Sequence, residues 1–577
     1  MTGEQMLQPT AVCGVLGRMT EAHRRRADSM AELAEEEGIT WQPSYLLPGL
    51  TLRVTNTAVV QRAERSVSAA WNAAGQIAPQ LLDQPWTSTA READACGLRT
   101  NARGSGTVHG SVSGCQVLYV HTAESAVFFS TRLRWLAETA EELTPDWQAW
   151  SEILAFGAPL AGRTTFTEIR RLMPMEYAEV TDSGAVRVSQ QHWPWEDYTP
   201  QAPPNLAEVT QETIAVMADH MRPHLDGTRA GGAANPMLSG GRDSRMLTAL
   251  AARESAHPQQ LTAWSTSSDA GSALEELVAA EVAETLSVEH RIITGRYSAF
   301  GEDFADYAEA VDFQASFHFW LMPVVRALRT SPGAIFDGIG GGVLLGGGFA
   351  DPADARPRTR RDLQLSRIQA RSRYLTEARK VLQDSVSVAV EERAYSGAWP
   401  TAERYADHPN AHTLTSYLLR TVPGISPAPA KVLGSAQPTV MPMVTDQVAQ
   451  LALKLPHQAK ADGAWYPRLL TAADPALRGM PTADDLTGTR HHKRRIASRE
   501  GARYLANLIR SGPAAGLLSA ELAAADPATA HGVVVWQKLL NSQRSQHLIR
   551  GLALLTLWLE QYGTRVTAAD PLRIQHA

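Results

Sequence analysis

The sequence predicts a chain of two parts, an α+β region rich in antiparallel strands over residues 1–200 and a large, helix-rich α/β region over residues 201–577. Short apolar runs with β-branched and aromatic residues, separated by Gly, Ser and Asp, fill residues 52–190 and are typical of strands. Alanine-rich runs with helical periodicity dominate beyond residue 206. Between them, "HWPWEDYTPQAPPNL" (192–206) has no periodicity and predicts a linker.

The composition and the net charge limit the classes of function to be considered. Apolar residues make up 44% of the 577 residues and the formal net charge is −6, so a large core is expected and a polyanionic partner is not. Three cysteines give neither a disulfide framework nor zinc spacing. No run reaches the roughly 18 apolar residues that span a bilayer, and the start carries no signal-peptide pattern. We therefore expect a cytoplasmic protein that binds neither nucleic acid nor membrane.

The first region mixes strands with helices. Strand-like runs are "LRVTNTAVV" (52–60), "CQVLYVHT" (115–122), "AVFFSTRL" (126–133) and "YAEVTDSGAVRVS" (177–189). The stretches "ADSMAELAEEE" (27–37) and "TRLRWLAETAEEL" (131–143) have helical periodicity. This alternation favours an α+β sandwich over an all-β domain.

The second region opens on "PMLSGGRDSRMLTAL" (236–250), which predicts a buried strand, a tight turn and the start of a helix. A glycine pair between strand and helix lets backbone N–H groups point into one concavity, where the helix dipole also favours an anion. An aspartate beside a phosphate implies a divalent cation between them, so Asp243 is the candidate magnesium ligand and a catalytic residue. The candidate nucleotide-binding residues of this loop are Leu238, Ser239, Gly240, Gly241, Asp243 and Ser244.

The pattern Ser-Gly-Gly-x-Asp-Ser resembles the pyrophosphate loop of the adenine-nucleotide α-hydrolases, and specifically that of asparagine synthetase-like enzymes. Three later stretches continue the resemblance in the same order. "LTAWSTSSD" (261–269) is similar to the second strand, "IFDGIGGGVLLGGG" (335–348) to the second glycine loop, and "PMVTDQVAQLALKLP" (442–456) to the "PFLD…ALxLP" segment. The resemblance implies an adenine-nucleotide α-hydrolase-like synthetase domain over residues 201–577.

The resemblance also implies the reaction. ATP activates a carboxylate as an acyl-adenylate in the presence of Mg²⁺, pyrophosphate leaves, and an amine attacks. It places Ser265, Asp337 and Gly338 against the nucleotide. It further implies a catalytic lysine in a late basic run, and "TRHHKRRIASREGAR" (489–503) supplies Lys493 as the candidate, although such a run is usually a solvated loop.

The first region indicates where the amine comes from. "CGVLG" (13–17) is similar to the start of the glutaminase domain of asparagine synthetases, in which an amino-terminal cysteine uses its own α-amine as base. Twelve residues precede Cys13, and the glutamine-binding stretches of that family are missing. We therefore predict a degenerate glutaminase-like (Ntn-type) domain over residues 1–200, with Cys13 a buried strand residue.

A glutaminase-like domain without its nucleophile, fused to such a synthetase, is found in β-lactam synthetases and in lasso peptide cyclases. The stretches "FFSTRLRWLA", "GRTTFTEIRRLMP" and "VDFQASFHFWLMP" are more similar to the cyclases. That resemblance implies an ATP-dependent macrolactam synthetase that joins the amino terminus of a linear core peptide to an internal Asp or Glu side chain, alongside a leader peptidase and a leader-binding protein. The alternatives are a glutamine-dependent asparagine synthetase, a β-lactam synthetase and a non-catalytic peptide-binding scaffold.

Some positions depart from these families. The second glycine loop of the family carries a magnesium-binding aspartate where this chain has Gly342, and Asp337 or Asp351 is the candidate replacement. The β-lactam synthetases place a tyrosine at the position of Ile339, which argues against β-lactam chemistry. The "PFLD" aspartate matches Thr445, and an aspartate follows at position 446.

Overall fold

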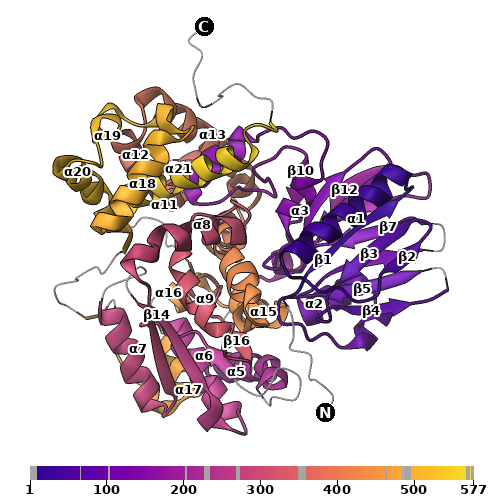
Figure 1. Ribbon diagram of the computed structural model, residues 1–577. Helices are drawn as coiled ribbons and strands as arrows, with labels where there is room; N and C mark the ends of the chain where they lie inside the picture. The colour runs from indigo at the N-terminus through magenta and orange to yellow at the C-terminus, as the bar shows by residue number, and fades with distance from the viewer. Residues whose placement is uncertain are drawn as a thin grey trace.

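The computed structural model describes residues 9–64, 66–101, 104–201, 205–225, 234–267, 273–348, 359–461, 464–483, 485–486, 495–566 and 572. Figure 1 shows a strand-rich part in indigo and violet, a part built around a parallel sheet, and a group of helices at the top of the view. No helix in the described ranges has both the length and the apolar character that crossing a membrane requires.

The first part is a sandwich of two six-stranded sheets in which every described strand pairing is antiparallel. One sheet has the order β10-β8-β9-β1-β3-β2 and the other the order β12-β11-β7-β6-β5-β4. The strands of the first sheet are β1 (Val12–Gly17), β2 (Tyr45–Leu47), β3 (Leu50–Val54), β8 (Tyr119–Thr122), β9 (Ala126–Ser130) and β10 (Ile169–Arg171). Those of the second are β4 (Val59–Arg62), β5 (Val67–Trp71), β6 (Cys96–Thr100), β7 (Gly106–His109), β11 (Glu176–Val180) and β12 (Val186–Gln190).

Alternation along the strands builds two cores. Val12 and Leu16 of β1 face the space between the sheets with Leu98 of β6, whereas Cys13 and Val15 face the outer side. Helix α1 (Glu21–Glu36) covers that outer side, and its buried residues recur at helical spacing: Ala27, Met30, Ala31 and Ala34. Three shorter helices complete this part, α2 (Trp86–Ala93), α3 (Leu133–Glu138) and α4 (Trp147–Phe156).

The predicted linker packs against both parts of the chain. It contains a short 3₁₀ helix over Pro194–Asp197, and the Trp195 side chain is fully buried. Its indole N–H donates to Asp446 Oδ1 (3.0 Å), and Arg91 Nε of α2 donates to Asp446 Oδ2 (2.7 Å). Tyr198 also donates to this carboxylate. Asp446 therefore joins the sandwich, the linker and the second part, which makes it a structural residue.

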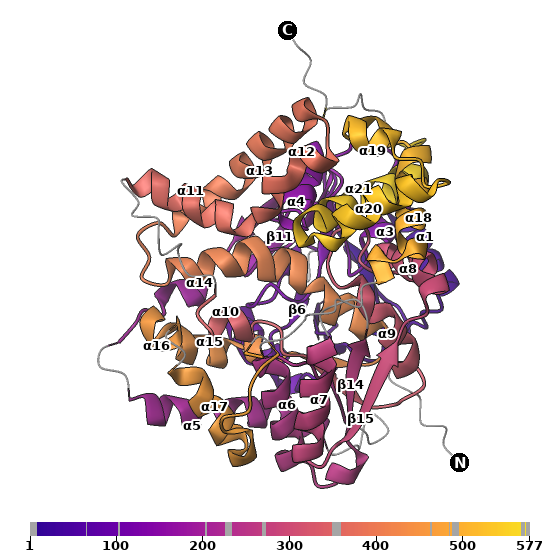
Figure 2. The ribbon, with the colours of Figure 1, turned by 90° about the vertical axis from the view of Figure 1, so that its left-hand side faces the viewer.

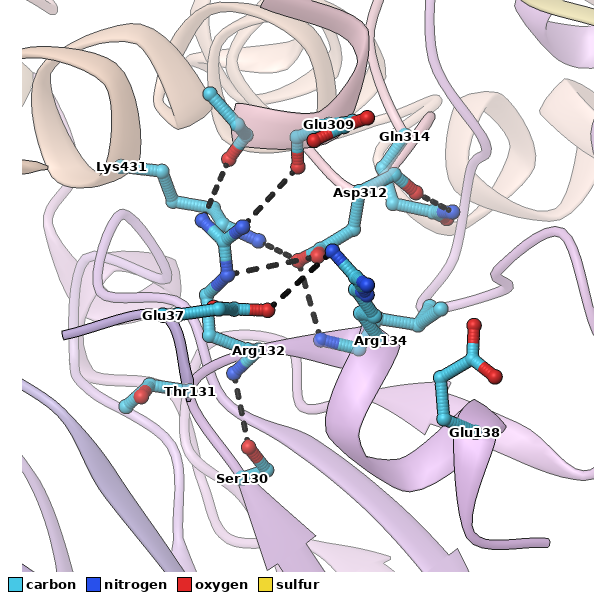
Figure 3. A network of polar contacts seen from close by, with 12 residues as sticks. Glu37, Ser130, Thr131, Arg132, Arg134, Glu138, Glu309, Asp312, Gln314 and Lys431 are labelled. Carbon is cyan, nitrogen blue, oxygen red and sulfur yellow. Dashed lines mark hydrogen bonds and ion pairs between the residues drawn. The ribbon is translucent and has the colours of Figure 1, made fainter. Parts of the chain in front are cut away.

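A second polar cluster lies where the sandwich meets the helices (Figure 3). Asp312 is 2% exposed, accepts a hydrogen bond from the backbone N–H of Leu133 (3.1 Å) and forms an ion pair with Lys431. Arg132 Nε lies 3.6 Å from Asp312 Oδ1, and its terminal nitrogens donate to the backbone carbonyls of Glu309 and Ala310. Burial opposes the charge of Asp312, yet Arg132 and Lys431 hold its pKa below the usual range. The two parts are thus fixed by a charged contact.

The second part is built on a parallel sheet. β14 (Thr262–Ser267) pairs with β15 (Glu289–Thr294), and β16 (Ala334–Phe336) pairs with β13 (Ala234–Pro236) and β17 (Thr439–Val440), all in parallel. A parallel bridge between Met237 and Trp264 joins the two groups, giving the order β15-β14-β13-β16-β17. The surrounding helices are α5 (Leu206–Met221), α6 (Arg242–Glu254), α7 (Ala273–Thr285), α8 (Phe300–Ala310), α9 (Met322–Leu328), α10 (Gly341–Leu344), α15 (Asp446–Leu453), α16 (His457–Ala461) and α17 (Trp465–Ala473).

A group of helices forms the opposite end of the molecule from α5, α6 and α17 (Figures 1 and 2). They are α11 (Arg360–Arg371), α12 (Ala378–Val381), α13 (Asp384–Arg404), α14 (Ala411–Ser416), α18 (Arg499–Ser511), α19 (Ala520–Ala524), α20 (Ala530–Asn541) and α21 (Gln543–Tyr562). Helix α4 of the first part packs against α13 and α21, so one hydrophobic core runs across both parts. The antiparallel first region and the helix-rich α/β second region confirm the predicted fold class at this level.

Candidate nucleotide site

The glycine loop lies at the carboxyl end of the central strand. After β13, the backbone N–H of Met237 donates to the carbonyl of Phe336 on one side (3.0 Å), and that of Leu238 donates to Trp264 on the other (2.8 Å). The chain then turns through residues 239–241 into α6. Ligands of open α/β sheets bind at the carboxyl ends of strands where neighbouring connections diverge, and a helix amino terminus there favours an anion.

The loop's polar groups are hydrogen-bonded to one another and to one carboxylate. The N–H of Gly240 donates to the Glu275 carboxylate (2.9 Å), and the N–H of Gly241 donates to Ser239 Oγ (3.2 Å). Ser244 Oγ accepts from the Ser239 N–H (3.0 Å) and lies 3.0 Å from Ser239 Oγ. These N–H and O–H groups converge on one small region, as a phosphate-binding loop requires.

A cavity of about 380 Å³ opens in front of the loop. One side is formed by loop and strand-end residues: Met237, Leu238, Ser239, Gly241, Arg242, Asp243, Ser244, Ser265, Thr266, Asp337 and Gly338. Glu275, which accepts the Gly240 N–H, also borders the loop. The remaining lining residues are Glu276, His318, Trp320, Leu321, Ile425, Ala428 and Pro429. Of the predicted site residues, the structure thus brings together Leu238, Ser239, Gly241, Asp243, Ser244, Ser265, Asp337 and Gly338, and Gly240 lies in the same loop.

Asp243 and Asp337 form the acidic corner of this cavity. Burial, together with a smaller contribution from the nearby charge of Asp337, raises the pKa of Asp243 to about 7, against a hydrogen bond from the Gly342 N–H. Burial also raises the pKa of Asp337 to about 6, although its Oδ1 accepts the Ile339 N–H (2.9 Å). Two carboxylates that resist ionisation together are stabilised by a bound cation.

This donor set fits Mg²⁺. The ion is usually held by one or two carboxylates together with phosphate oxygens and water, and Asp243 and Asp337 supply two carboxylates beside the phosphate loop. In the described ranges, this site included, no three His, Cys, Asp or Glu side chains gather in an arrangement that could hold a metal ion by themselves. The site therefore suits a metal that arrives with the nucleotide.

The second glycine loop approaches Asp243 closely. A Cβ at Gly341 would lie 2.5 Å from Asp243 Cγ, and one at Gly338 would lie 2.9 Å from Asp243 Cβ, so both positions require glycine. At Gly342, by contrast, a Cβ would meet only Asp243 Oδ2 at 3.8 Å. The position that departs from the family thus has room for a side chain pointing toward Asp243.

Ser265 holds the loop from the neighbouring strand. Its Oγ donates to the carbonyl of Leu238 (2.7 Å) and lies 2.7 Å from His290 Nε2, and the residue is 3% exposed. The predicted contact of Ser265 with the nucleotide stays a prediction, because this hydroxyl already has partners in the protein.

Sequence reasoning missed Arg245, which is fully buried behind the loop. Its Nε donates to the carbonyl of Gly241 (2.9 Å) and its Nη2 to that of Gly240 (2.9 Å). Two further bonds reach the carbonyls of Met480 (3.2 Å) and Pro481 (3.1 Å). The partners at 480–481 lie far away in sequence, so only the charge in "SGGRDSR" hinted at a role.

Sequence reasoning also missed His318 as a site residue. It has left-handed backbone angles (φ 68°, ψ 18°), and its buried Nδ1 has no hydrogen-bond partner among the residues that the structure describes. The turn that carries it is fixed to the sheet, because Thr266 Oγ1 donates to the carbonyl of Trp320 (2.8 Å). Non-glycine residues held in this backbone region cluster at functional sites. The stretch "VDFQASFHFWLMP" includes His318, and its similarity to the lasso peptide cyclases was the signal that could have identified this residue.

The other residues that the sequence singled out do not line this cavity. Lys493 and Asp351 lie outside the described residues. Arg495, in the same basic run as Lys493, is fully buried and pairs with Asp303 (2.5 Å), so this end of the run is not the solvated loop that its charge pattern suggested. Thr445 caps α15, since its Oγ1 accepts the Val448 N–H (3.4 Å).

Cys13 is buried in the middle of β1. It is 0% exposed, as are Cys96 and Cys115, and burial raises the pKa of its thiol well above the usual range. A thiol in this environment is a poor nucleophile, because the thiolate is the reactive form. The structure therefore offers no support for a glutaminase centre at Cys13.

Comparison with known proteins agrees with the site. Residues 228–473 match the family model for asparagine synthase, and this stretch is an asparagine synthase domain. It contains the glycine loop, both aspartates and the second glycine loop. The predicted resemblance is confirmed at this level, and the family implies an ATP-dependent, AMP-forming amide ligase that uses Mg²⁺. A search of curated proteins gives no match to the chain.

Proposed function

We propose that the chain is a macrolactam synthetase of the lasso peptide cyclase type. It would adenylate an Asp or Glu side chain of a linear core peptide and join it to the amino terminus of the same peptide. The observation that carries this proposal is the contrast between a well-formed nucleotide loop and a buried thiol. Because Cys13 is not placed to release ammonia from glutamine, we assign the amine to the substrate itself.

The first step takes place at the loop. A peptide carboxylate oxygen attacks the α-phosphorus, a C–O–P linkage forms and the bond to pyrophosphate breaks. In this proposal the phosphates would be held by the hydroxyls of Ser239 and Ser244 and by the N–H groups of Gly240 and Gly241, which would exchange the Glu275 carboxylate and Ser239 Oγ for phosphate oxygens. Asp243 and Asp337 would hold Mg²⁺, which offsets charge on the departing pyrophosphate. Lys493 is proposed as the cation that stabilises charge developing on the α-phosphate.

The second step uses the other side of the cavity. The peptide amine attacks the acyl carbonyl, a C–N bond forms, AMP leaves and the amine proton passes to water. Trp320, Ile425 and Pro429 line this side with apolar surface, and His318 adds a polar ring. Burial lowers the pKa of His318 to about 3, so the ring is neutral and does not repel an ammonium group. A leader peptidase would supply the free amino terminus, and a leader-binding protein would deliver the peptide.

Synthetic linear peptides test the proposal. Each peptide carries a free amino terminus and one internal Asp or Glu at a varied position, and is incubated with ATP and Mg²⁺. We expect a product lighter by one water, together with AMP and pyrophosphate, detected by mass spectrometry. An amino-terminally acetylated peptide should still release pyrophosphate but should not form a ring.

Other outcomes would select the alternatives. Glutamine-dependent amide formation with ammonia release would favour an asparagine synthetase. Tight peptide binding without any consumption of ATP would favour a scaffold, and either result would overturn the proposed function.

A further inference from the structure

A second cavity adjoins the glycine loop. Its volume is about 380 Å³, and it shares Gly241, Arg242, Asp243 and Glu275 with the first cavity. Its remaining lining residues are Gly240, Gly342, Gly346, Tyr466, Thr482 and Asp485. The loop thus borders two cavities, and Thr482 and Asp485 form part of the wall of the second.

Arg245 ties the two walls of this second cavity together. Its guanidinium donates to the carbonyls of Gly240 and Gly241 in the loop and to those of Met480 and Pro481 in the opposite segment. A backbone hydrogen bond from the Ala483 N–H to the Gly240 carbonyl (3.2 Å) reinforces the link. The planar fork of arginine suits several carbonyls in fixed directions better than an ammonium group does.

These bonds also orient the N–H groups of the loop. In a planar trans peptide the carbonyl and the N–H of the next residue point in opposite directions. Fixing the carbonyls of Gly240 and Gly241 therefore fixes the N–H directions of Gly241 and Arg242, and both residues line the two cavities. A donor set fixed in advance binds developing charge without reorganising.

We propose that Arg245 is a positioning residue that sets the loop and the 480–483 segment at the separation that the β- and γ-phosphates of ATP, and then pyrophosphate, require. The proposal rests on the proposed function only in assigning the loop to a nucleotide triphosphate. It predicts that Arg245 acts on ligands that carry a pyrophosphate group and leaves the adenosine and α-phosphate contacts in the first cavity unchanged.

Binding of three ligands tests this proposal, with the full chain and Mg²⁺ in isothermal titration calorimetry. For Arg245→Met we expect the Kd of ATP and of pyrophosphate to rise about 10- to 100-fold while that of AMP changes less than about twofold. Arg245→Lys keeps the charge but not the fork and should fall between the parent and Arg245→Met. Unchanged AMP binding in the same samples shows that the variants are folded.

Arg253→Met is the matched control. Arg253 lies on the same helix and also donates to backbone carbonyls, those of Ala472 (3.0 Å) and Ala473 (3.2 Å), but at the far end from the loop. It should leave all three Kd values at the parent level. Equal losses for AMP and ATP in both Arg245 variants, or no loss for ATP, would overturn the positioning role. Failure of the parent protein to bind ATP would instead refute the proposed function.

Discussion

The two centres that the sequence offered, Cys13 and Asp243, are both removed from bulk water but in different ways. Cys13 lies on β1 beneath helix α1, fully buried among apolar side chains, and it lines neither cavity at the glycine loop. Asp243 faces two cavities, with backbone donors and a second carboxylate beside it. Burial raises both pKa values, yet only the aspartate has space for a ligand. Desolvation alone therefore does not identify a reactive group; desolvation next to a shaped, polar cavity does.

The largest effect is expected at Asp243. Asp243→Ala removes the carboxylate that lies between the loop and the second glycine loop, so AMP and pyrophosphate formation should fall by more than about 100-fold. Enzyme-coupled pyrophosphate detection measures the loss, and circular dichroism checks the fold. Asp219→Asn changes an exposed carboxylate of α5, away from the loop, and should keep turnover near the parent level. Normal pyrophosphate release from Asp243→Ala would contradict the assignment of this loop as the site that binds the phosphates of ATP and Mg²⁺.

The next largest effect is expected at Lys493. If its ammonium group stabilises charge in the transition state, Lys493→Ala should lower the adenylation rate by about 10- to 100-fold and change ATP binding much less. Rapid-quench kinetics separates the rate from the binding. The exposed Lys538 on α20 provides the control variant Lys538→Ala. Parent-like kinetics for both variants would mean that Lys493 has no catalytic role and would favour the interpretation of its run as a solvated basic loop.

A smaller effect is expected from exchanging the second carboxylate. Asp337→Ala should raise the Mg²⁺ concentration needed for half-maximal turnover about tenfold, because Asp243 alone holds the ion loosely. Adding Gly342→Asp to that variant should recover much of the loss, since the position has room for a side chain next to Asp243. Asp351→Ala is measured alongside, because Asp351 is the other candidate for the second metal-binding carboxylate. A loss in Asp351→Ala and none in Asp337→Ala would assign the metal to Asp351 instead.

No loss of activity is expected at Cys13. Cys13→Ala should keep the parent rate of ring closure, because the amine comes from the peptide. Thiol titration with an aromatic disulfide should detect none of the three cysteines in the folded protein and all three after unfolding, as their burial and raised pKa values require. Rapid modification of Cys13, coupled to inactivation, would revive a thiol role for the first region.

The difference between what could and could not be predicted follows from sequence distance. The loop from Ser239 to Ser244 was predictable because its strand, turn and helix signals are local. Arg245 was not, because two of its four carbonyl partners lie more than 230 residues further along the chain. Asp446 likewise takes its function from Arg91 and Trp195, which no local pattern connects to it.

Part of the wall of the first cavity could not be predicted from the sequence, for a different reason. Residues 417–432, "YLLRTVPGISPAPAKV", contain three prolines and a glycine, which locally predict a loop. The structure has wide π-type turns over Tyr417–Ile425 and Ala428–Val432, and Ile425, Ala428 and Pro429 line the cavity. π-Helical turns are frequent at functional sites and carry no simple periodicity in sequence. Tertiary packing of this segment outweighs its weak helix propensity.

The transfer of one oxygen atom tests the central claim most directly. The claim is that the loop around Asp243 activates a carboxylate as an acyl-adenylate before an amide forms. A linear peptide whose acidic side chain carries oxygen-18 is incubated with the protein, ATP and Mg²⁺, and the nucleotide products are analysed by mass spectrometry. The account predicts AMP that contains one oxygen-18 atom for each amide formed. Unlabelled AMP, or ADP and phosphate in its place, would contradict it.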